Sequence, residues 1–340
     1  RALDAAARAA FSADGGRAGP RALPGVSPYP SAIAELGVIA NALLVIGSVP
    51  ALPAVLIWLL WRARKAEPER RRRAWAEFLA ATAAVLALAW VPVRRRPGLM
   101  QARLWRWWLE YMSVRVAYRS GEALPERQYL FVMVPHGLYP FSGACAAISK
   151  MVHVFFGMRI AVASNALRVP IVRHLMGWIG CVGASQASIG RALQQGDSVC
   201  IFPGGIGEMV RTDSSSERLL LGARKGFARL ALQHGVPVVP VYVFGQSVAF
   251  GQLPLPAWVE RLSRWLRVSL ILPFGRFGLL IPRKLPLLYT IGAPILAARS
   301  PDPTASEVDA VHGATVAAVR DMYHFYRGAY GWGDRPLHVE

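Results

Sequence analysis

Two long apolar stretches, each followed by a cluster of arginines, lie near the start of this 340-residue chain. The first, Ala32 to Trp61, contains a single charged residue. A helix needs about 20 residues to cross a ~30 Å hydrocarbon core, so this stretch suffices for one tilted span or for two half-depth helices kinked at Pro50 and Pro53. The second stretch, Phe78 to Val93, is only just long enough to span. We therefore predict a membrane-embedded region over residues 31–96.

The loops that flank the second stretch are strongly basic. Seven of the residues from Arg62 to Arg73 are basic, and Arg94, Arg95 and Arg96 follow the stretch. Loops of this kind favour the cytoplasmic side of a membrane, and both cannot lie there if the stretch between them crosses. We therefore expect one of the two stretches to be re-entrant or to lie in the interface. The alternative, two buried helices of a soluble core, is disfavoured because neither stretch has a polar face.

Composition supports contact with lipid. Hydrophobic residues make up 54% of the chain and charged residues 17%, which excludes a disordered chain. The net charge of +19 favours a polyanionic partner, although only four of the 39 basic residues are lysines, which suggests codon bias. Because the sequence has no recognisable nucleic-acid-binding module, we expect membrane phosphates and not nucleic acid as the partner. The three cysteines lack a C-x-x-C spacing, so neither a disulfide framework nor a thiolate metal site is indicated.

Three further segments lead to specific predictions. Residues 1–30 are rich in Ala, Arg, Gly and Pro, and we interpret them as an unstructured tail or a targeting remnant. The tryptophans of residues 104–112 alternate with arginine, and such rings suit the headgroup level of a membrane. Residues 258–281 suggest an amphipathic element lying in the membrane plane, with ordinary core packing as the alternative.

After Gly121 short apolar runs alternate with helical segments. We predict strands over residues 129–134, 159–163, 198–202, 236–244 and 287–291, with helices near 140–153, 167–177, 185–195 and 219–234. Alternation of this kind favours an α/β fold with a mainly parallel sheet flanked by helices. Pro237 and Pro240 predict that the 236–244 strand lies at an edge or carries a bulge.

Two of these strands end in unusual loops. One gives Pro135-His136-Gly137, and the other gives a glycine-rich turn from Phe202 to Glu208 whose amides can approach an oxyanion or a phosphate. Ligands of open α/β sheets bind beyond the carboxyl ends of the strands, so both loops should open on one edge. Each signal alone is modest, because a histidine after a strand is more often structural.

Taken together, these blocks resemble the type-2 diacylglycerol acyltransferases with their monoacylglycerol and wax-alcohol relatives. The matching segments are residues 129–131 leading into Pro135-His136-Gly137, Asn165 to Met176, Phe202 to Glu208, Arg224 to Phe227 and His234 to Gly245. The resemblance implies a glycerolipid-acyltransferase-like fold, an N-terminal membrane hairpin and a catalytic domain over residues 97–340. Val134 stands where the family usually has a second histidine, and Pro140 stands where related glycerolipid acyltransferases place an aspartate. The carboxylate partner of His136 must therefore come from elsewhere.

The implied reaction is transfer of an acyl group from acyl-CoA, the co-substrate, to diacylglycerol, without a metal or other cofactor. His136 would be the general base, and Glu208 would orient it or hold a glycerol hydroxyl. Gly137, Gly204, Gly205 and Gly207 would form the turn whose amides stabilise the oxyanion. Arg224 and Lys225 would bind the phosphates of coenzyme A. Asn165 and Arg168 would line the acceptor pocket.

Other functions stay open at this point. The acceptor could be a monoacylglycerol or a long-chain alcohol. A serine esterase is a rival because Gly245-Gln246-Ser247-Val248-Ala249 nearly forms a nucleophile elbow, with Asp302 or Asp309 and His312 or His324 as triad partners. A non-catalytic lipid-binding membrane protein is a second rival, for which Val134 would be the signature. The family implies the endoplasmic reticulum membrane and lipid droplets, with a plastid envelope as the alternative and an oligomer possible.

Overall fold

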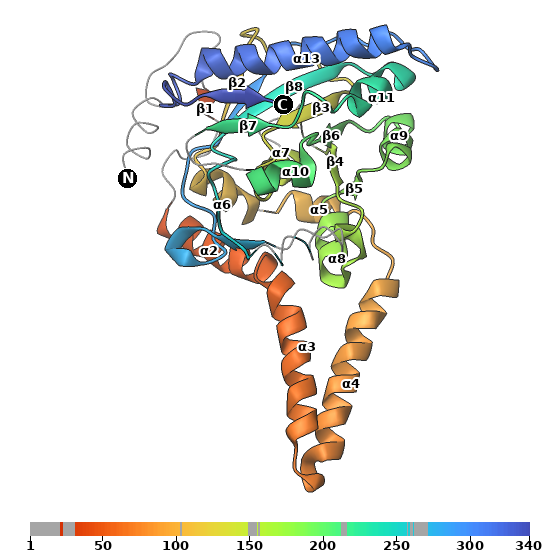
Figure 1. The fold of residues 1–340 in the computed structure, drawn as a ribbon, viewed down its shortest axis with the longest axis vertical. Helices are drawn as coiled ribbons and strands as arrows, with labels where there is room; N and C mark the ends of the chain where they lie inside the picture. Colours follow the sequence, from red (N-terminus) through yellow and green to blue (C-terminus); the bar gives the residue numbers. More distant parts are fainter. Residues whose placement is uncertain are drawn as a thin grey trace.

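A long helical hairpin projects from a layered α/β domain in the computed structural model of this chain (Figure 1). The structure describes residues 21–22, 31–102, 104–148, 155, 157–211, 216–256, 258, 261 and 271–340. The tail predicted over residues 1–30 lies outside these residues except for Arg21–Ala22, which pair as β1 with β2 (Arg115–Tyr118). Residues 259–260 and 262–270 of the element predicted over residues 258–281 also lie outside them, as do residues 149–153 of the first predicted helix.

Three helices form the N-terminal region: α2 (Ala32–Val45), α3 (Ser48–Lys65) and α4 (Pro68–Trp90). α2 packs on the α/β domain through Ala34, Val38 and Ala42, which are fully buried at four-residue spacing, while Leu36 and Leu44 point outward. α3 and α4 pack against each other as the hairpin. Among the helices of the described residues, α4 alone is long and apolar enough to cross a membrane.

The first apolar stretch breaks at Gly47 and not at its prolines, so that part of the prediction is wrong. A Cβ on Gly47 would overlap the carbonyl oxygen of Leu43, so only glycine lets the chain pass from α2 to α3 here. Pro50 lies in the first turn of α3, where no backbone N–H is required, and Pro53 is accommodated inside the helix. The region is therefore one helix docked on the domain followed by one hairpin.

The core of the domain is a mixed eight-stranded sheet of order β1-β2-β11-β8-β3-β6-β4-β5. Its remaining strands are β3 (Leu130–Val134), β4 (Arg159–Val162), β5 (Val182–Gly183), β6 (Val199–Ile201), β8 (Val238–Phe244) and β11 (Leu288–Ile291). The five neighbours from β8 to β5 run parallel, so their carboxyl ends lie at one edge. β11 runs antiparallel to β8. The predicted strands are confirmed to within two residues at each end.

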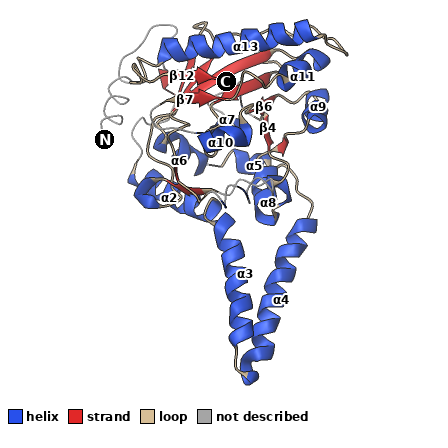
Figure 2. Cartoon of the chain, viewed as in Figure 1, coloured by secondary structure: helices blue, strands red, loops and turns tan. Residues whose placement is uncertain are grey.

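Helices cover both faces of this sheet (Figure 2). On one face Leu130, Val132 and Val134 pack with α9 (Gln186–Gln194), α11 (Gly226–His234) and α13 (Ala305–Tyr326). On the other, Phe131 and Met133 pack with α2, α6 (Leu104–Tyr111) and α7 (Phe141–Ile148).

The remaining elements are short. The helices are α5 (Pro97–Met100), η2 (Ala166–Arg168), α8 (Pro170–Trp178), α10 (Gly205–Arg211) and η3 (Arg276–Gly278). Two strand pairs lie outside the main sheet: β9 (Gly251–Leu253) with β10 (Leu272–Phe274), and β7 (Glu217–Leu219) with β12 (Leu337–Val339).

Three expectations about these elements are corrected. The helix predicted over residues 219–234 begins only at Gly226, because residues 217–219 form β7. β8 lies inside the sheet and not at its edge. The bulge alternative holds, since the four residues from Val238 to Val241 face five residues from Ile291 to Ile295.

The tryptophans of α6 take part in contacts within the protein. Trp108 is buried and its indole N–H donates to Oδ1 of Asn41 on α2 at 3.0 Å, while Trp105 donates to the carbonyl oxygen of Leu99. Trp108 therefore joins α2 to the domain, and the position of this segment at a headgroup level stays a prediction.

Candidate active site

The two loops singled out from the sequence meet at one edge of the sheet, as predicted. β3 lies between β6 and β8, and all three strands are parallel. Their carboxyl ends therefore bring together the His136 loop, the glycine-rich turn after Phe202, and residues 245–247 after β8.

His136 is held by its backbone from both sides. Its N–H donates to Oε2 of Glu208 at 2.6 Å, and its carbonyl oxygen accepts from Nε2 of Gln246 at 3.2 Å. Both partners are buried side chains. The position of His136 is therefore set by groups on the two strand ends that flank its own.

The imidazole of His136 is arranged as a base. Its Nδ1 lies 2.8 Å from the carbonyl oxygen of Gly137, and since a carbonyl can only accept, Nδ1 carries the hydrogen and Nε2 keeps its lone pair. The ring packs edge-on to Phe202, with centroids 5.7 Å apart. Burial lowers the pKa of His136 below its ordinary 6.5, partly offset by the bond to Gly137, so the ring is neutral at neutral pH.

Glu208 is a buried carboxyl group whose two oxygens accept from two backbone amides. Besides the bond from His136, Oε1 accepts from the N–H of Leu220 at 2.9 Å. Burial raises the pKa of Glu208 to about 7, opposed by these bonds and by the charge of Arg224. A Cβ on Gly204 would overlap this carboxyl group, so the glycine after Pro203 makes room for it. Of the two roles considered for Glu208, these bonds fit orientation of His136, exerted through the backbone.

Gln246 is a site residue that the sequence reasoning missed. Its Nε2 also donates to the carbonyl oxygen of Tyr139, and its Oε1 accepts from the N–H of Ser142 at 3.3 Å. Gly137, at φ +61°, passes close to the backbone oxygen of Gln246, where a side chain would crowd it. The signal was obscured: Gln246 lies two residues after β8, but Pro237 and Pro240 predicted that this strand lies at an edge or carries a bulge.

A second buried polar cluster lies behind this one. Glu217 accepts from Ser247 Oγ at 2.6 Å, from Arg335 Nη2 at 2.6 Å and from the Tyr242 hydroxyl at 2.9 Å. Glu217 and Arg335 lie more than a hundred residues apart in the sequence, and no local pattern links them.

The esterase triad does not form. Ser247 donates to Glu217, whereas Nε2 of His312 lies 2.9 Å from the carbonyl oxygen of Leu221. Asp309 pairs with Lys225, and His324 is exposed on α13. No histidine therefore activates Ser247 within the part of the chain that the structure describes.

The structure separates the two basic residues assigned to coenzyme A. The guanidinium of Arg224 lies 3.9 Å from the position that a Cβ on Gly207 would occupy, so Arg224 faces the glycine-rich turn. Lys225, at the start of α11, pairs with Asp309 at 2.7 Å. Only Arg224 is thus brought to the candidate site.

The remaining assigned residues lie at the same edge. Asn165 and Arg168 are exposed on and beside η2, which follows β4, two strands from β3. Within the turn, the N–H of Gly205 donates to the carbonyl oxygen of Phe202 at 3.2 Å and is already used there. Gly204 and Gly207 are the remaining glycine amides of this turn assigned to an oxyanion.

Comparisons with known proteins show the family of this chain. Residues 91–339 match the family model described as diacylglycerol acyltransferase. Diacylglycerol O-acyltransferase 1 of Eremothecium gossypii is 28% identical in an alignment of 279 residues that covers 75% of this chain and 60% of that protein. 2-acylglycerol O-acyltransferase 1 of Bos taurus is 27% identical, over 70% of this chain and 76% of that protein. Acyl-CoA wax alcohol acyltransferase 2 of Homo sapiens is 26% identical, over 70% and 77%.

A solved structure also aligns with this chain. The crystal structure of the 1-acyl-sn-glycerophosphate acyltransferase PlsC of Thermotoga maritima covers 85% of this chain and 95% of that chain, with a TM-score of 0.41 and 16% identity.

Proposed function

Because this chain belongs to the diacylglycerol acyltransferase family, we propose that it is an O-acyltransferase that transfers an acyl group from acyl-CoA to the hydroxyl of diacylglycerol. The observation that carries the proposal is the state of His136: a neutral ring with Nδ1 bonded to Gly137 and Nε2 left to accept a proton, at the edge of the sheet where ligands bind. The names of the relatives support an acylglycerol or a long-chain alcohol as acceptor and acyl-CoA as donor.

In the proposed reaction, Nε2 of His136 takes the proton of the acceptor hydroxyl as that oxygen attacks the thioester carbonyl. The new C–O bond forms, the C–S bond breaks, and His136 returns the proton to the departing thiolate of coenzyme A. The backbone amides of Gly204 and Gly207 would stabilise the tetrahedral oxyanion, each donor contributing about 3 kcal/mol. The reaction requires no metal or further cofactor.

Substrate contacts follow from position at the sheet edge. Arg224, exposed beside the turn, would bind a phosphate of coenzyme A with its guanidinium fork. Lys225, already paired with Asp309, would contribute little. Asn165 and Arg168 would line the acceptor pocket.

We propose that the hairpin of α3 and α4 enters the membrane, where diacylglycerol resides. α4 has 23 residues, and at 1.5 Å per residue it reaches about 34 Å, close to the thickness of a hydrocarbon core. Large apolar side chains are exposed along both helices, and Leu44 of α2 and Phe277 of η3 are exposed as well. Glu35 in the first turn of α2 ties this helix to the domain by pairing with Arg276 at 2.5 Å and Lys284 at 2.9 Å. The family favours the endoplasmic reticulum as the membrane concerned.

An acceptor panel tests the proposed function. The purified full chain, in phosphatidylcholine vesicles, is given labelled acyl-CoA with diacylglycerol, monoacylglycerol or a long-chain alcohol, and the products are resolved by mass. We expect triacylglycerol as the main ester. Absence of ester from every acceptor, with lipid binding retained, would favour the non-catalytic alternative.

A further inference from the structure

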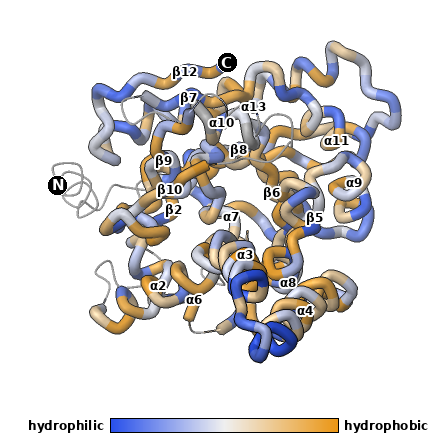
Figure 3. Tube along the Cα trace, turned by 60° about the horizontal axis from the view of Figure 1, so that its bottom comes forward, coloured by the Kyte–Doolittle hydropathy of each residue, from blue (hydrophilic) through white to orange (hydrophobic). Residues whose placement is uncertain are grey.

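The tip of the hairpin, residues 62–73, is the part of the molecule farthest from the α/β domain (Figure 1). It carries seven basic residues against Glu67 and Glu69. Figure 3 shows the tip as a strongly hydrophilic segment between two helices that are largely hydrophobic. A charge concentration of this kind at the end of an apolar hairpin needs an anionic environment.

Most of these cations have no anionic partner among the residues that the structure describes. Glu77 pairs with Arg62 and with Arg73, the latter at 3.2 Å. The other five basic residues of the tip form no ion pair with a carboxylate in the described ranges: Arg64, Lys65, Arg70, Arg71 and Arg72. Their charges are available to a ligand from outside.

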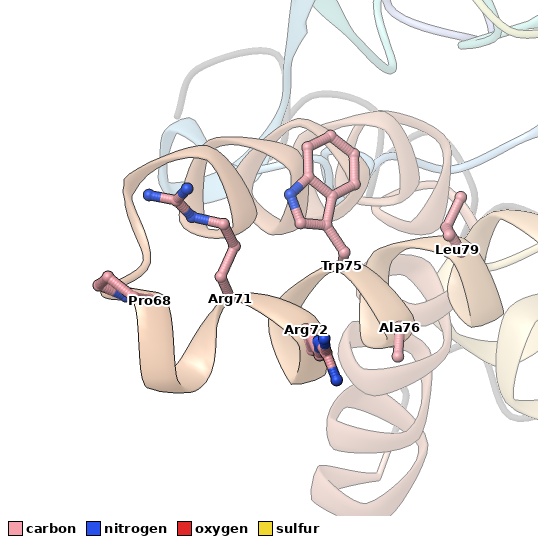
Figure 4. Close-up of a pocket in the computed structure, with 6 residues that line it drawn as sticks. All are labelled: Pro68, Arg71, Arg72, Trp75, Ala76 and Leu79. Atoms are coloured by element: carbon pink, nitrogen blue, oxygen red, sulfur yellow. The ribbon is translucent and has the colours of Figure 1, made fainter.

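Two of these arginines line a pocket. Pro68, Arg71, Arg72, Trp75, Ala76 and Leu79 surround an open pocket of about 540 Å³ on α4 (Figure 4). Arg71, Trp75 and Leu79 follow one another at four-residue spacing, and Figure 4 shows their side chains on the same side of the helix. Leu79 is 58% exposed.

Arg71, Trp75 and Leu79 form a ridge along α4, and their chemical order matches the order of groups in a phospholipid. A guanidinium binds phosphate through paired N–H donors, an indole suits the interface between headgroup and hydrocarbon, and a leucine suits acyl chains. The order runs from the tip towards the base of the hairpin, as it must if the tip faces water.

The length of α4 also suits a position of the tip at the far side of the membrane. From Arg73 to Trp90, α4 rises about 26 Å, slightly less than the ~30 Å of a hydrocarbon core. Trp90, 87% exposed, would mark the interface on the side of the α/β domain. Arg71 and Arg72 would then reach the phosphates of the opposite leaflet.

We propose that Arg71, Arg72 and Trp75 form a binding site for an anionic phospholipid in the leaflet opposite the α/β domain. The proposal rests on membrane entry of the hairpin but not on the acyl transfer reaction. A water-soluble ligand fits these side chains less well than a lipid, because it would offer Trp75 and Leu79 no apolar contact. The ligand is a lipid, held by its phosphate at one end and by its acyl chains at the other.

The test is lipid binding by the purified full chain in detergent micelles, titrated with phosphatidylglycerol or phosphatidylcholine and read by native mass spectrometry. An arginine at a membrane surface contributes about fivefold in affinity, so Arg71→Gln with Arg72→Gln should weaken phosphatidylglycerol binding about thirtyfold. Trp75→Ala should weaken it less. The matched control is Arg299→Gln with Arg320→Gln, which removes the same charge from exposed positions on the α/β domain and should change nothing.

Equal phosphatidylglycerol affinity in the wild type and the Arg71/Arg72 variant would overturn the proposal, and so would an equal loss in the control. Tighter binding of a single-stranded RNA, lost in the same variant, would assign the tip to nucleic acid instead. Acyl transfer in phosphatidylcholine vesicles serves as the second readout. Its retention in the Arg71/Arg72 variant separates failure of lipid binding from failure of the enzyme.

Discussion

The backbone N–H of His136 donates a 2.6 Å hydrogen bond to Oε2 of Glu208, which lies 72 residues later in the chain. The bond joins the loop after β3 to the helix that follows β6. Gln246, after β8, holds the carbonyl oxygen of the same histidine. The position of the proposed base therefore depends on two buried side chains that do not themselves need to touch substrate.

Glu208→Gln should lower activity and change its pH dependence. Only the ionised carboxyl group accepts fully from both His136 and Leu220, and its pKa of about 7 predicts that kcat/KM falls as the pH drops through 7. The amide of the variant keeps one acceptor, so we expect a loss of about ten- to hundredfold, corresponding to ~1.5 to 3 kcal/mol. The limb near pH 7 should disappear, leaving one below 6.5 from His136. Persistence of the limb at pH 7 would contradict the role of Glu208.

Gln246→Ala should lower kcat about tenfold or more while leaving the KM for acyl-CoA little changed. The substitution leaves three buried backbone groups without their partner, which loosens the His136 loop. Gln246→Glu keeps the acceptor for Ser142 and, when protonated, one donor, so it should be less impaired. Steady-state kinetics of the two variants at several pH values provide the check. Equal damage in both would argue for a purely structural role.

Substitutions of Arg224 and Lys225 provide a test variant and its matched control. Arg224→Gln should raise the KM for acyl-CoA about tenfold, the effect of losing ~1.4 kcal/mol of phosphate binding. It should also move the acid limb to higher pH, because the charge of Arg224 lowers the pKa of Glu208. Lys225→Gln should leave both unchanged, since Lys225 pairs with Asp309. An equal rise in KM for both variants would show that the structure does not separate their roles.

Arg335→Met should destabilise the fold strongly. Glu217 is fully buried, and without Arg335 its carboxylate loses its cation, a change that costs about 3 to 5 kcal/mol in comparable buried pairs. The double variant Arg335→Met with Glu217→Gln removes both charges and should recover much of that loss. Thermal unfolding of the detergent-solubilised chain measures both effects. Additive losses in the double variant would contradict a direct charge coupling.

The sequence was sufficient to predict that the two candidate loops meet at one edge of the sheet. Short β-branched and aromatic runs marked β3, β6 and β8, and the rule that ligands bind beyond the carboxyl ends of parallel strands predicted that His136 and the glycine-rich turn would meet. The local pattern did not reveal how they meet. Glu208 binds a backbone N–H and not a side chain, and a backbone partner has no signature in the sequence.

The remaining differences between the predicted and the observed structure have causes that a local sequence pattern does not show. Gln246 and the Glu217–Arg335 pair depend on contacts between distant segments. Pro240 suggested an edge strand, but a one-residue bulge opposite it lets β8 remain central. Trp108 of α6 suits a membrane interface by composition, yet it is buried and bonded to Asn41 of α2, a contact that no local pattern reveals.

The central claim is that Nε2 of His136 acts as the base in ester formation. The most direct measurement compares wild type, His136→Ala and Ser247→Ala for ester formation from labelled acyl-CoA and diacylglycerol in the same vesicles, with acyl-CoA binding measured in parallel. General base catalysis contributes about 10²- to 10⁴-fold, so His136→Ala should abolish measurable ester formation while still binding acyl-CoA. Ser247→Ala should remain active, because its hydroxyl bonds to Glu217 and not to a histidine. Retained activity in His136→Ala, or loss in Ser247→Ala alone, would contradict the claim.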